Sequence, residues 1–324
     1  MTTLRFDDEV VLITGAGRGL GREYALAFGA RGAAVVVNDI CDDPASPSPA
    51  LAVAEEMVAA GGRAAAMPGS VAESSSAREI VEGAIRAFGR LSILVNNAGV
   101  IDFGTLDAID DMMWRRMMGV TLDGTFYMTR AAWPHLCAQG YGRIVNTTSN
   151  AGFAGCAQLV HYGAAKLGVA GLTKALAQEC EGLDITVNAV APMAVTRMNR
   201  DTFFGGAEPD QSDWVADIRD GKVPMGPPEA IAPAVLWLAH RSTRINGEIF
   251  STSSGKVGRL GFVVGEGYFD PHHAPEDLRD NADRIRSLDP CSEPRSTGDE
   301  LALIPPLFRE RLDGALHAPP PGDH

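Results

Sequence analysis

The chain has 324 residues, which is enough for one large α/β domain with an appendage or for two small domains. Its formal net charge of −13 argues against a DNA- or RNA-binding surface, because that affinity comes mainly from Lys and Arg on phosphates. No apolar run approaches the roughly 20 residues of a membrane-spanning helix, and the first residues lack a signal-peptide pattern. The five cysteines are scattered without a C-x-x-C pair, which predicts reduced thiols in a cytoplasmic protein and no metal site.

Short β-branched runs alternate with longer Ala-rich stretches. The expected strands cover residues 10–14, 34–38, 64–67, 93–96, 143–147, 186–190 and 248–252. The expected helices cover residues 21–30, 50–60, 75–88, 110–132, 162–179 and 228–239. Wholly apolar strand centres are typical of strands covered on both faces. The alternation therefore predicts an α/β fold with a doubly wound parallel sheet of the Rossmann type, which binds ligands at the carboxyl ends of its strands.

Three stretches interrupt this alternation. Residues 41–49 form a loop rich in Pro, Ser and Asp. Residues 199–225 mix Gly, Asp and aromatic residues, and we expect them to form a substrate loop within the domain. After residue 270 the chain becomes rich in Pro, Asp and Arg. We therefore expect one domain over residues 1–270 and an irregular C-terminal extension over residues 271–324, partly packed and partly disordered.

A glycine-rich turn directly follows the first expected strand. It comprises Gly15, Ala16, Gly17, Arg18, Gly19, Leu20 and Gly21. Such a turn at the start of a helix brings backbone N–H groups and the positive end of the helix dipole against a pyrophosphate. Glycine also permits positive φ angles and a close approach of the backbone. The turn therefore predicts a site for the phosphates of a dinucleotide.

The residue type at the end of the second strand indicates which dinucleotide binds. Asp39 follows Gly19 by about twenty residues, where a carboxylate accepts hydrogen bonds from ribose hydroxyls and repels a 2′-phosphate. This favours NAD over NADP. Arg18 favours the opposite choice, because a cation in the glycine turn could pair with a 2′-phosphate. Asp39 carries more weight, since its clash with a phosphate would be a desolvated contact between like charges.

Three polar residues predict proton-transfer chemistry. Tyr162 and Lys166 are four residues apart at the start of an expected helix, so they lie on one helical face. A tyrosine with its ordinary pKa of about 10 is a poor base, and a nearby ammonium group favours the phenolate. Ser149 follows the fifth strand and can reach the same point. A Y-x-x-x-K pattern alone is weak, but its combination with the glycine turn and this serine is specific.

Together these motifs resemble the short-chain dehydrogenase/reductase family from about Phe6 to Leu260. The resemblance implies that Tyr162 is the general acid/base, that Lys166 holds the nicotinamide ribose and lowers the tyrosine pKa, and that Ser149 orients the substrate oxygen. It also implies an NAD-binding domain over residues 1–270. The implied cofactor contacts are Gly15, Arg18, Gly19, Leu20, Gly21, Asp39, Ser70, Val71, Asn97, Ala98, Gly99, Tyr162, Lys166, Pro192 and Thr196. Short stretches look most like (3R)-hydroxyacyl-CoA and hydroxysteroid dehydrogenases.

Three positions depart from the family pattern. Thr121 stands where the family usually has an asparagine that anchors a water for proton relay. Residues 69–71, Gly-Ser-Val, stand where many members place an aspartate against the adenine. Met193 replaces the usual glycine after the proline of strand six, so the nicotinamide side of the site is expected to be narrower.

The expected substrate is an apolar alcohol or ketone, such as a hydroxysteroid, a terpene alcohol or a 3-hydroxyacyl thioester. Phe203 and Phe204 lie in the expected substrate loop, and Phe153 and His161 lie close in sequence to the catalytic candidates. The helix over residues 162–179 is apolar around most of its circumference, which predicts a homodimer or homotetramer.

Other functions remain open at this point. The chain would be an NADP-dependent carbonyl reductase if attraction of a 2′-phosphate by Arg18 outweighed its repulsion by Asp39. A non-catalytic nucleotide-sensing protein of the same fold would have no need of Ser149, Tyr162 and Lys166 together. A nucleotide-sugar epimerase shares much of the site, but it normally has a larger substrate domain than the extension seen here.

Overall fold

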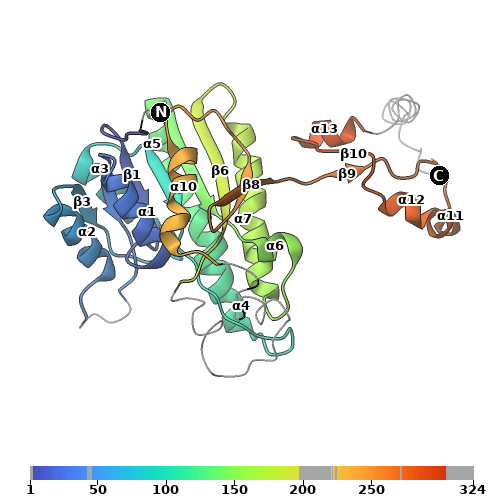
Figure 1. The fold of residues 1–324 in the computed structure, drawn as a ribbon, viewed down its shortest axis with the longest axis horizontal. Helices are drawn as coiled ribbons and strands as arrows, with labels where there is room; N and C mark the ends of the chain where they lie inside the picture. The colour runs from blue at the N-terminus through green and yellow to red at the C-terminus, as the bar shows by residue number, and fades with distance from the viewer. Residues whose placement is uncertain are drawn as a thin grey trace, which may run out of the picture. The chain divides into compact units, whose positions relative to one another are not determined.

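The computed structural model describes residues 3–41, 46–196, 220, 222, 225–270 and 272–303. The chain divides into two compact units, Met1–Leu260 and Gly261–His324 (Figure 1). Among the described residues, no helix is long and apolar enough to cross a membrane.

An eight-stranded sheet forms the centre of the first unit. The strands lie in the order β3-β2-β1-β4-β5-β6-β7-β8. Their bounds are β1 Val10–Ile13, β2 Ala34–Val37, β3 Arg63–Ala66, β4 Ile93–Asn96, β5 Tyr141–Thr147, β6 Asp184–Met193, β7 Ile249–Ser253 and β8 Lys256–Leu260. Strands β1 to β7 are parallel, and β8 pairs antiparallel with β7. The predicted doubly wound sheet is confirmed, and the order reverses between β1 and β4, where ligands bind in such folds.

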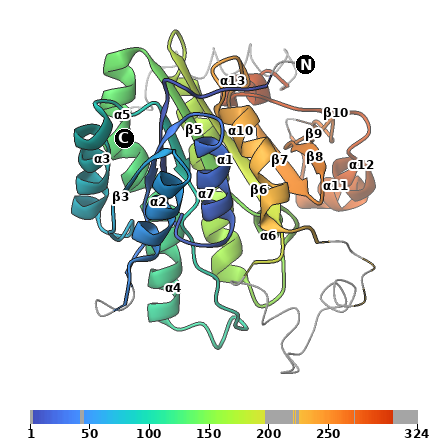
Figure 2. The same cartoon turned by 60° about the vertical axis from the view of Figure 1, so that its left-hand side comes forward.

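Helices cover both faces of this sheet (Figures 1 and 2). One face carries α1 Gly19–Gly29, α2 Pro49–Ala59 and α10 Ala232–Ala239, and the other carries α3 Ser74–Phe88, α5 Gly124–Gln139 and α7 Val160–Glu179. Val11 of β1 packs in the first core with Phe28 of α1, whereas Leu12 packs in the second core with Met128 of α5. Alternate side chains of one strand thus enter two cores, which is why the strands read as continuous apolar runs.

The single helix expected over residues 110–132 is in fact three elements. Helix α4, Asp111–Met118, is followed by the π-helical turn η1, Gly119–Asp123, and then by α5. Thr121 is fully buried in this turn, and the Thr125 hydroxyl donates to the Thr121 carbonyl oxygen at 2.8 Å. Turns of this kind are frequent at functional sites, and periodicity alone does not distinguish them from α-helix.

Two short elements complete the first unit. Helix α6, Asn150–Ala154, lies between β5 and α7, and its five residues are too few to show a helical period. The helix expected over residues 228–239 is divided into the 3-10 helix η2, Pro228–Ala230, and α10. Proline at the first helical positions of both elements fits this division, because proline has no N–H to donate.

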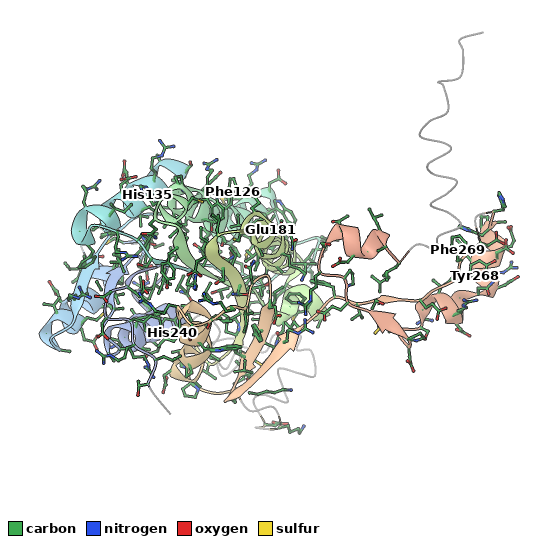
Figure 3. All side chains as sticks on the ribbon, turned by 90° about the horizontal axis from the view of Figure 1, so that it is seen from above. Phe126, His135, Glu181, His240, Tyr268 and Phe269 are labelled. Atoms are coloured by element: carbon green, nitrogen blue, oxygen red, sulfur yellow. The ribbon has the colours of Figure 1, made fainter. Side chains whose placement is uncertain are left out.

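The second unit consists of short elements. Strands β9, Val264–Gly265, and β10, Cys291–Ser292, pair antiparallel, and the helices are α11 Pro275–Asp280, α12 Ala282–Arg286 and α13 Thr297–Leu301. None of its described residues is buried. Tyr268 and Phe269 belong to this unit, and the Phe269 side chain is 43% exposed (Figure 3). The described part therefore has defined local structure, which the sequence did not predict, without a buried core of its own.

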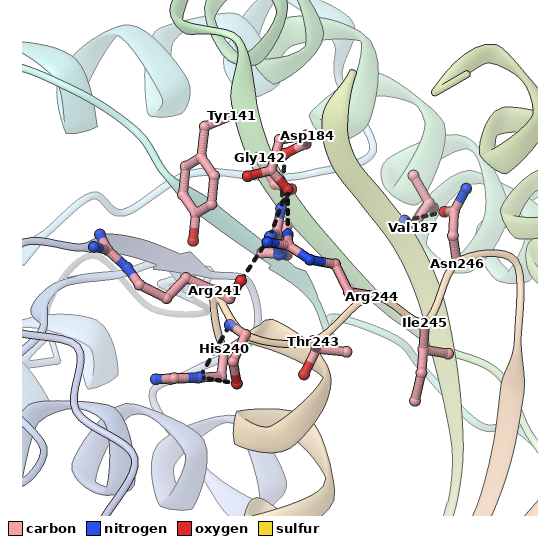
Figure 4. A network of polar contacts seen from close by, with 12 residues as sticks. Tyr141, Gly142, Asp184, Val187, His240, Arg241, Thr243, Arg244, Ile245 and Asn246 are labelled. Atoms are coloured by element: carbon pink, nitrogen blue, oxygen red, sulfur yellow. Dashed lines mark hydrogen bonds and ion pairs between the residues drawn. The ribbon is translucent and has the colours of Figure 1, made fainter. Parts of the chain in front are cut away.

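Polar and charged side chains form a clasp at the amino ends of the strands (Figure 4). Arg143 at the start of β5 is fully buried, and its Nη2 donates to Asp184 Oδ1 at 2.8 Å. Glu9, immediately before β1, accepts from Arg241 Nη2 at 2.7 Å and from the Tyr141 hydroxyl at 3.1 Å. Asp184 and Arg241 are each about half exposed, so the main effect of the clasp is to supply hydrogen-bond partners to the buried Arg143 and Glu9 side chains.

Candidate active site

The three catalytic candidates meet where β5 ends and α7 begins. Ser149 caps the N-terminus of α6, and its side chain accepts from the Ala151 N–H at 3.2 Å. Its hydroxyl also forms a hydrogen bond with Tyr162. Lys166 lies one turn further along α7, with its Nζ 5.7 Å from the centroid of the Tyr162 ring. The structure thus brings together three residues that come from two elements.

Burial governs the ionisation of this trio. It raises the pKa of Tyr162, and the hydrogen bond with Ser149 offsets part of that effect. The Lys166 side chain is buried, which lowers the pKa of its ammonium group to about 8. Its Nζ donates to the Thr147 carbonyl oxygen at 2.8 Å. The family resemblance implies a lowered tyrosine pKa, whereas desolvation is the larger effect on Tyr162 in this structure.

The glycine turn adopts the backbone that a phosphate site requires. Gly15 and Gly19 have φ angles of 63° and 54°, a region that favours glycine. A Cβ atom at Gly15 would lie 2.8 Å from the Ala98 Cα, so a side chain is excluded there. Among the described residues, a Cβ atom at Gly19 would meet only Thr196, at 3.9 Å. Within the described part of the chain, Gly19 and Thr196 therefore leave room at the N-terminus of α1 that fits a pyrophosphate group.

Asp39 reaches back from the end of β2 to this turn. Its Oδ2 accepts from the Gly17 N–H at 2.9 Å, and its Oδ1 accepts from the Ile40 N–H at 2.8 Å. Both bonds fix the carboxylate at the edge of the glycine turn. The negative charge is thereby held at the glycine turn, and its contact with an adenosine ribose stays a prediction.

The segment after β4 fastens the glycine turn from the other side. Asn97 Nδ2 donates to the carbonyl oxygens of Thr14 and Gly15 at 2.9 and 3.1 Å. The Thr14 hydroxyl accepts from the N–H groups of Asn97 and Ala98, both at 3.0 Å. The Asn97 amide therefore holds the backbone of the turn, a scaffolding role that its residue type alone did not reveal.

Gly99 lies against the catalytic lysine. A Cβ atom there would lie 3.4 Å from Lys166 Nζ and 3.8 Å from Thr121 Oγ1. Thr121 Oγ1 also lies 3.7 Å from the Met117 sulfur. Thr121, which stands where the family usually has asparagine, and the ammonium group of Lys166 thus both lie next to Gly99.

Asn38 is a residue that the sequence did not single out. Its Nδ2 donates to the carbonyl oxygens of Met67 and Gly69 at 2.8 and 3.1 Å. The expected adenine-side residues follow at once: Ser70 is half-buried and Val71 is buried. Asn38 therefore ties the end of β2 to the segment expected to meet the adenine. The only sequence signal was a polar residue closing an apolar strand.

The remaining cofactor candidates lie around the same edge of the sheet. Arg18 is the residue before α1 and has an extended backbone, and Leu20 in the first turn packs against the first core. Pro192 is the second-last residue of β6 and lies opposite Thr252 of β7.

The substrate candidates are placed only in part. Phe153 of α6 packs against a small buried cluster from α7, β6 and β7. His161, next to Tyr162, is fully buried, and neither of its ring nitrogens has a hydrogen-bond partner within the described part of the chain. Phe203 and Phe204 lie outside the described residues.

Comparison with known proteins identifies the family of this chain. The family model described as short chain dehydrogenase matches residues 9–203. The chain belongs to the short chain dehydrogenase family. The family expected from the sequence is thereby confirmed.

Relatives share both sequence and fold with this member of the short chain dehydrogenase family. It is 38% identical to the peroxisomal multifunctional enzyme type 2 of Mus musculus over 98% of this chain, and it spans only 43% of that enzyme. It is 36% identical to a short-chain type dehydrogenase/reductase of Mycobacterium tuberculosis, over 91% of this chain and 98% of that protein. A crystal structure of a short chain dehydrogenase from Mycobacterium avium has a TM-score of 0.73 and 35% identity, covering 87% of this chain and 96% of that one.

Proposed function

We propose that this protein is an NAD-dependent dehydrogenase that interconverts a secondary alcohol and a ketone. The convergence of two groups of residues on one edge of the sheet carries the proposal. Ser149, Tyr162 and Lys166 gather beyond the end of β5, while the glycine turn and Asp39 gather beyond the ends of β1 and β2. The carboxyl ends of parallel strands are where such folds bind ligands.

The nicotinamide cofactor, when bound, supplies the hydride acceptor or donor. The backbone of the glycine turn and the dipole of α1 would hold its pyrophosphate, and Asp39 would accept from its ribose hydroxyls. Lys166 would hold the nicotinamide ribose. The room that the described residues leave beside Gly19 and the fixed Asp39 carboxylate both fit this group.

Tyr162 is the proton donor and acceptor in this proposal. Burial keeps its hydroxyl protonated at neutral pH, as reduction of a ketone requires, and Ser149 orients the substrate oxygen beside it. In the oxidative direction the ammonium of Lys166 stabilises the phenolate, which then takes the proton of the alcohol. The pKa of about 8 leaves most of this ammonium charged at pH 7.

A spectrophotometric screen tests the proposal. Hydroxysteroids, terpene alcohols and 3-hydroxyacyl thioesters are offered with NAD and with NADP, and formation of the reduced cofactor is followed. We expect NADH to form with at least one alcohol class. Preferred turnover of NADPH with ketones would favour the carbonyl reductase instead, and tight NAD binding without any turnover would favour a nucleotide-sensing protein.

Removing the charge of Asp39 should relax the preference for NAD. In Asp39→Asn the shape and an acceptor oxygen remain, while the repulsion of a 2′-phosphate is lost. We expect the ratio of the NADP and NAD dissociation constants to fall by about tenfold, which is roughly 1.4 kcal/mol. Calorimetric titration of both proteins with both cofactors measures it. Equal or tighter binding of NADP by the unmodified protein would contradict the assignment and favour Arg18.

We infer that the second unit narrows the substrate range without supplying catalytic groups. Leu278, Ile285 and Leu288 are 40%, 39% and 59% exposed within it, and apolar side chains exposed in this way favour contact with an apolar substrate or a second copy of the chain. Because β9 pairs with β10, a cut before Pro271 would leave β9 unpaired, so the chain is best ended after Leu260.

This truncation should leave the NAD dissociation constant within about twofold and change the KM for the alcohol or the oligomeric mass. Fluorescence titration, steady-state kinetics and light scattering measure the three quantities. Loss of NAD binding in soluble, folded protein would show that the second unit belongs to the cofactor domain. A protein unchanged in all three would show that the unit has no part in substrate choice.

A homodimer or homotetramer completes the proposal, with a second copy of this chain packed on α5 and α7. Phe126 of α5 is 43% exposed (Figure 3), and Val160 and Leu167 of α7 are 47% and 39% exposed. Large apolar side chains exposed along neighbouring helices are typical of a subunit contact.

A further inference from the structure

Three consecutive residues at the end of β5 each hold a different part of the Tyr162–Lys166 pair. The Thr147 carbonyl oxygen accepts from Lys166 Nζ at 2.8 Å. The Thr148 hydroxyl donates to the main-chain carbonyl oxygen of Lys166 at 2.5 Å. The Ser149 hydroxyl bonds with Tyr162. The first and third contacts are made by the side chains of Lys166, Ser149 and Tyr162, which the sequence predicts to be catalytic. The second contact is made by the side chain of Thr148, for which the sequence predicts no role.

We propose that Thr148 is a positioning residue, which fixes α7 so that Tyr162 and Lys166 keep their places relative to Ser149. This inference rests on the proposed dehydrogenase function. Thr148 is itself firmly held, because it is only 1% exposed and its N–H donates to the Val190 carbonyl oxygen of β6 at 2.8 Å. Thr148 therefore links the backbone of β6 to the backbone of α7 and fixes the helix relative to the sheet.

The other two contacts cannot perform this task. The Lys166 Nζ is separated from its backbone by a flexible four-carbon stem, so the bond with Thr147 fixes the ammonium group and not the helix. The bond between Ser149 and Tyr162 has to yield when a substrate oxygen enters between these groups. Thr148 alone among the three consecutive residues grips the main chain of α7. Misplacement of a catalytic group by about 1 Å can lower a rate about 100-fold, so a fixed helix matters for turnover.

A matched pair of substitutions separates positioning from stability. Thr148→Val removes the hydroxyl and keeps the branched shape, while Thr148→Ser keeps the hydroxyl. Thr173→Val is the control. Thr173 lies on α7 and, like Thr148, is buried; its hydroxyl donates to the Val169 carbonyl oxygen and accepts from Asn146 Nδ2. Both valine variants should lower the midpoint of thermal unfolding by similar amounts.

Only Thr148→Val should lower kcat, by about tenfold, with the NAD dissociation constant within about twofold of the unmodified protein. Its pH profile of kcat for alcohol oxidation should move to higher pH, because the phenolate of Tyr162 loses stabilisation. Thr148→Ser should restore both the rate and the profile. A Thr148→Val protein whose kcat and pH profile match those of Thr173→Val would overturn the proposal.

Crystal structures of the two valine variants supply a readout that needs no substrate. In Thr148→Val the turn from Tyr162 to Lys166 should move relative to β5, and in Thr173→Val it should stay in place. An unmoved turn in Thr148→Val would likewise overturn the proposal. Absence of turnover in the unmodified protein would instead count against the dehydrogenase function, and the crystallographic comparison would still decide the role of Thr148.

Discussion

Replacing Tyr162 with phenylalanine should lower kcat by about two orders of magnitude or more, while the nicotinamide cofactor still binds within about twofold of its normal affinity. The change removes only the hydroxyl that bonds with Ser149 and would carry the proton. The ring remains 5.7 Å from Lys166 Nζ, so the packing of α7 is retained. Steady-state kinetics, cofactor titration and thermal unfolding measure the three quantities.

A second tyrosine provides the control for that substitution. Tyr141 donates its hydroxyl to Glu9 at 3.1 Å in the clasp, at the opposite end of β5. Tyr141→Phe should therefore lower the free energy of unfolding by about 1 kcal/mol and leave kcat unchanged. If Tyr162→Phe turned over any accepted substrate at nearly the normal rate, the assignment of the general acid/base would be wrong.

Replacing Lys166 with methionine should lower kcat about 100-fold and weaken binding of the nicotinamide cofactor about tenfold. Methionine is unbranched and of similar size, so it leaves little cavity beside Gly99. The variant loses the charge that stabilises the tyrosine phenolate and the donor expected to hold the nicotinamide ribose. Lys174→Met on the same helix is the control and should change neither quantity.

Lys166→Met should lose activity without losing stability at neutral pH. Burial lowers the pKa of Lys166 from 10.5 to about 8, so between these values the unfolded chain binds more protons than the folded one. The stability contributed by Lys166 is therefore greatest above pH 10.5 and is lost as the pH falls through 8. The loss amounts to roughly 3 kcal/mol at neutral pH.

Lys166→Met should accordingly be at least as stable as the unmodified protein at pH 7, and this advantage should shrink as the pH approaches 10. Thermal unfolding of both proteins at the two pH values tests it. A variant several kcal/mol less stable at pH 7 would show that the bond from Nζ to the Thr147 carbonyl outweighs the cost of burying the charge.

The sequence predicted the strands well because burial on both faces leaves a strong signal. Val11 and Leu12 enter different cores, so even neighbouring positions must be apolar, and the run is visible without an alignment. The trio and the glycine turn were also accessible, since their chemistry limits the residue types that can serve.

Features that depend on a distant partner were not accessible. Thr148 bonds with a carbonyl 18 residues away, and Asn38 bonds with carbonyls 29 and 31 residues away. The π-helical turn at Thr121 and the antiparallel edge strand β8 follow from packing that no local period records. The sequence therefore predicts no role for Asn38 beside the expected adenine site or for Thr148 beside Lys166, and the structure shows the contacts of both.

The position of the clasp has a practical consequence for laboratory evolution. Arg143 lies near the start of β5 and Thr147 ends it, so these two residues of the clasp and the reactive edge are separated by roughly 13 Å of strand. A library aimed at new alcohols can therefore randomise the reactive edge while Glu9, Arg143 and Asp184 are held constant. Since most substitutions destabilise, the stability conserved at the opposite edge determines how many changes of specificity the scaffold tolerates before it unfolds.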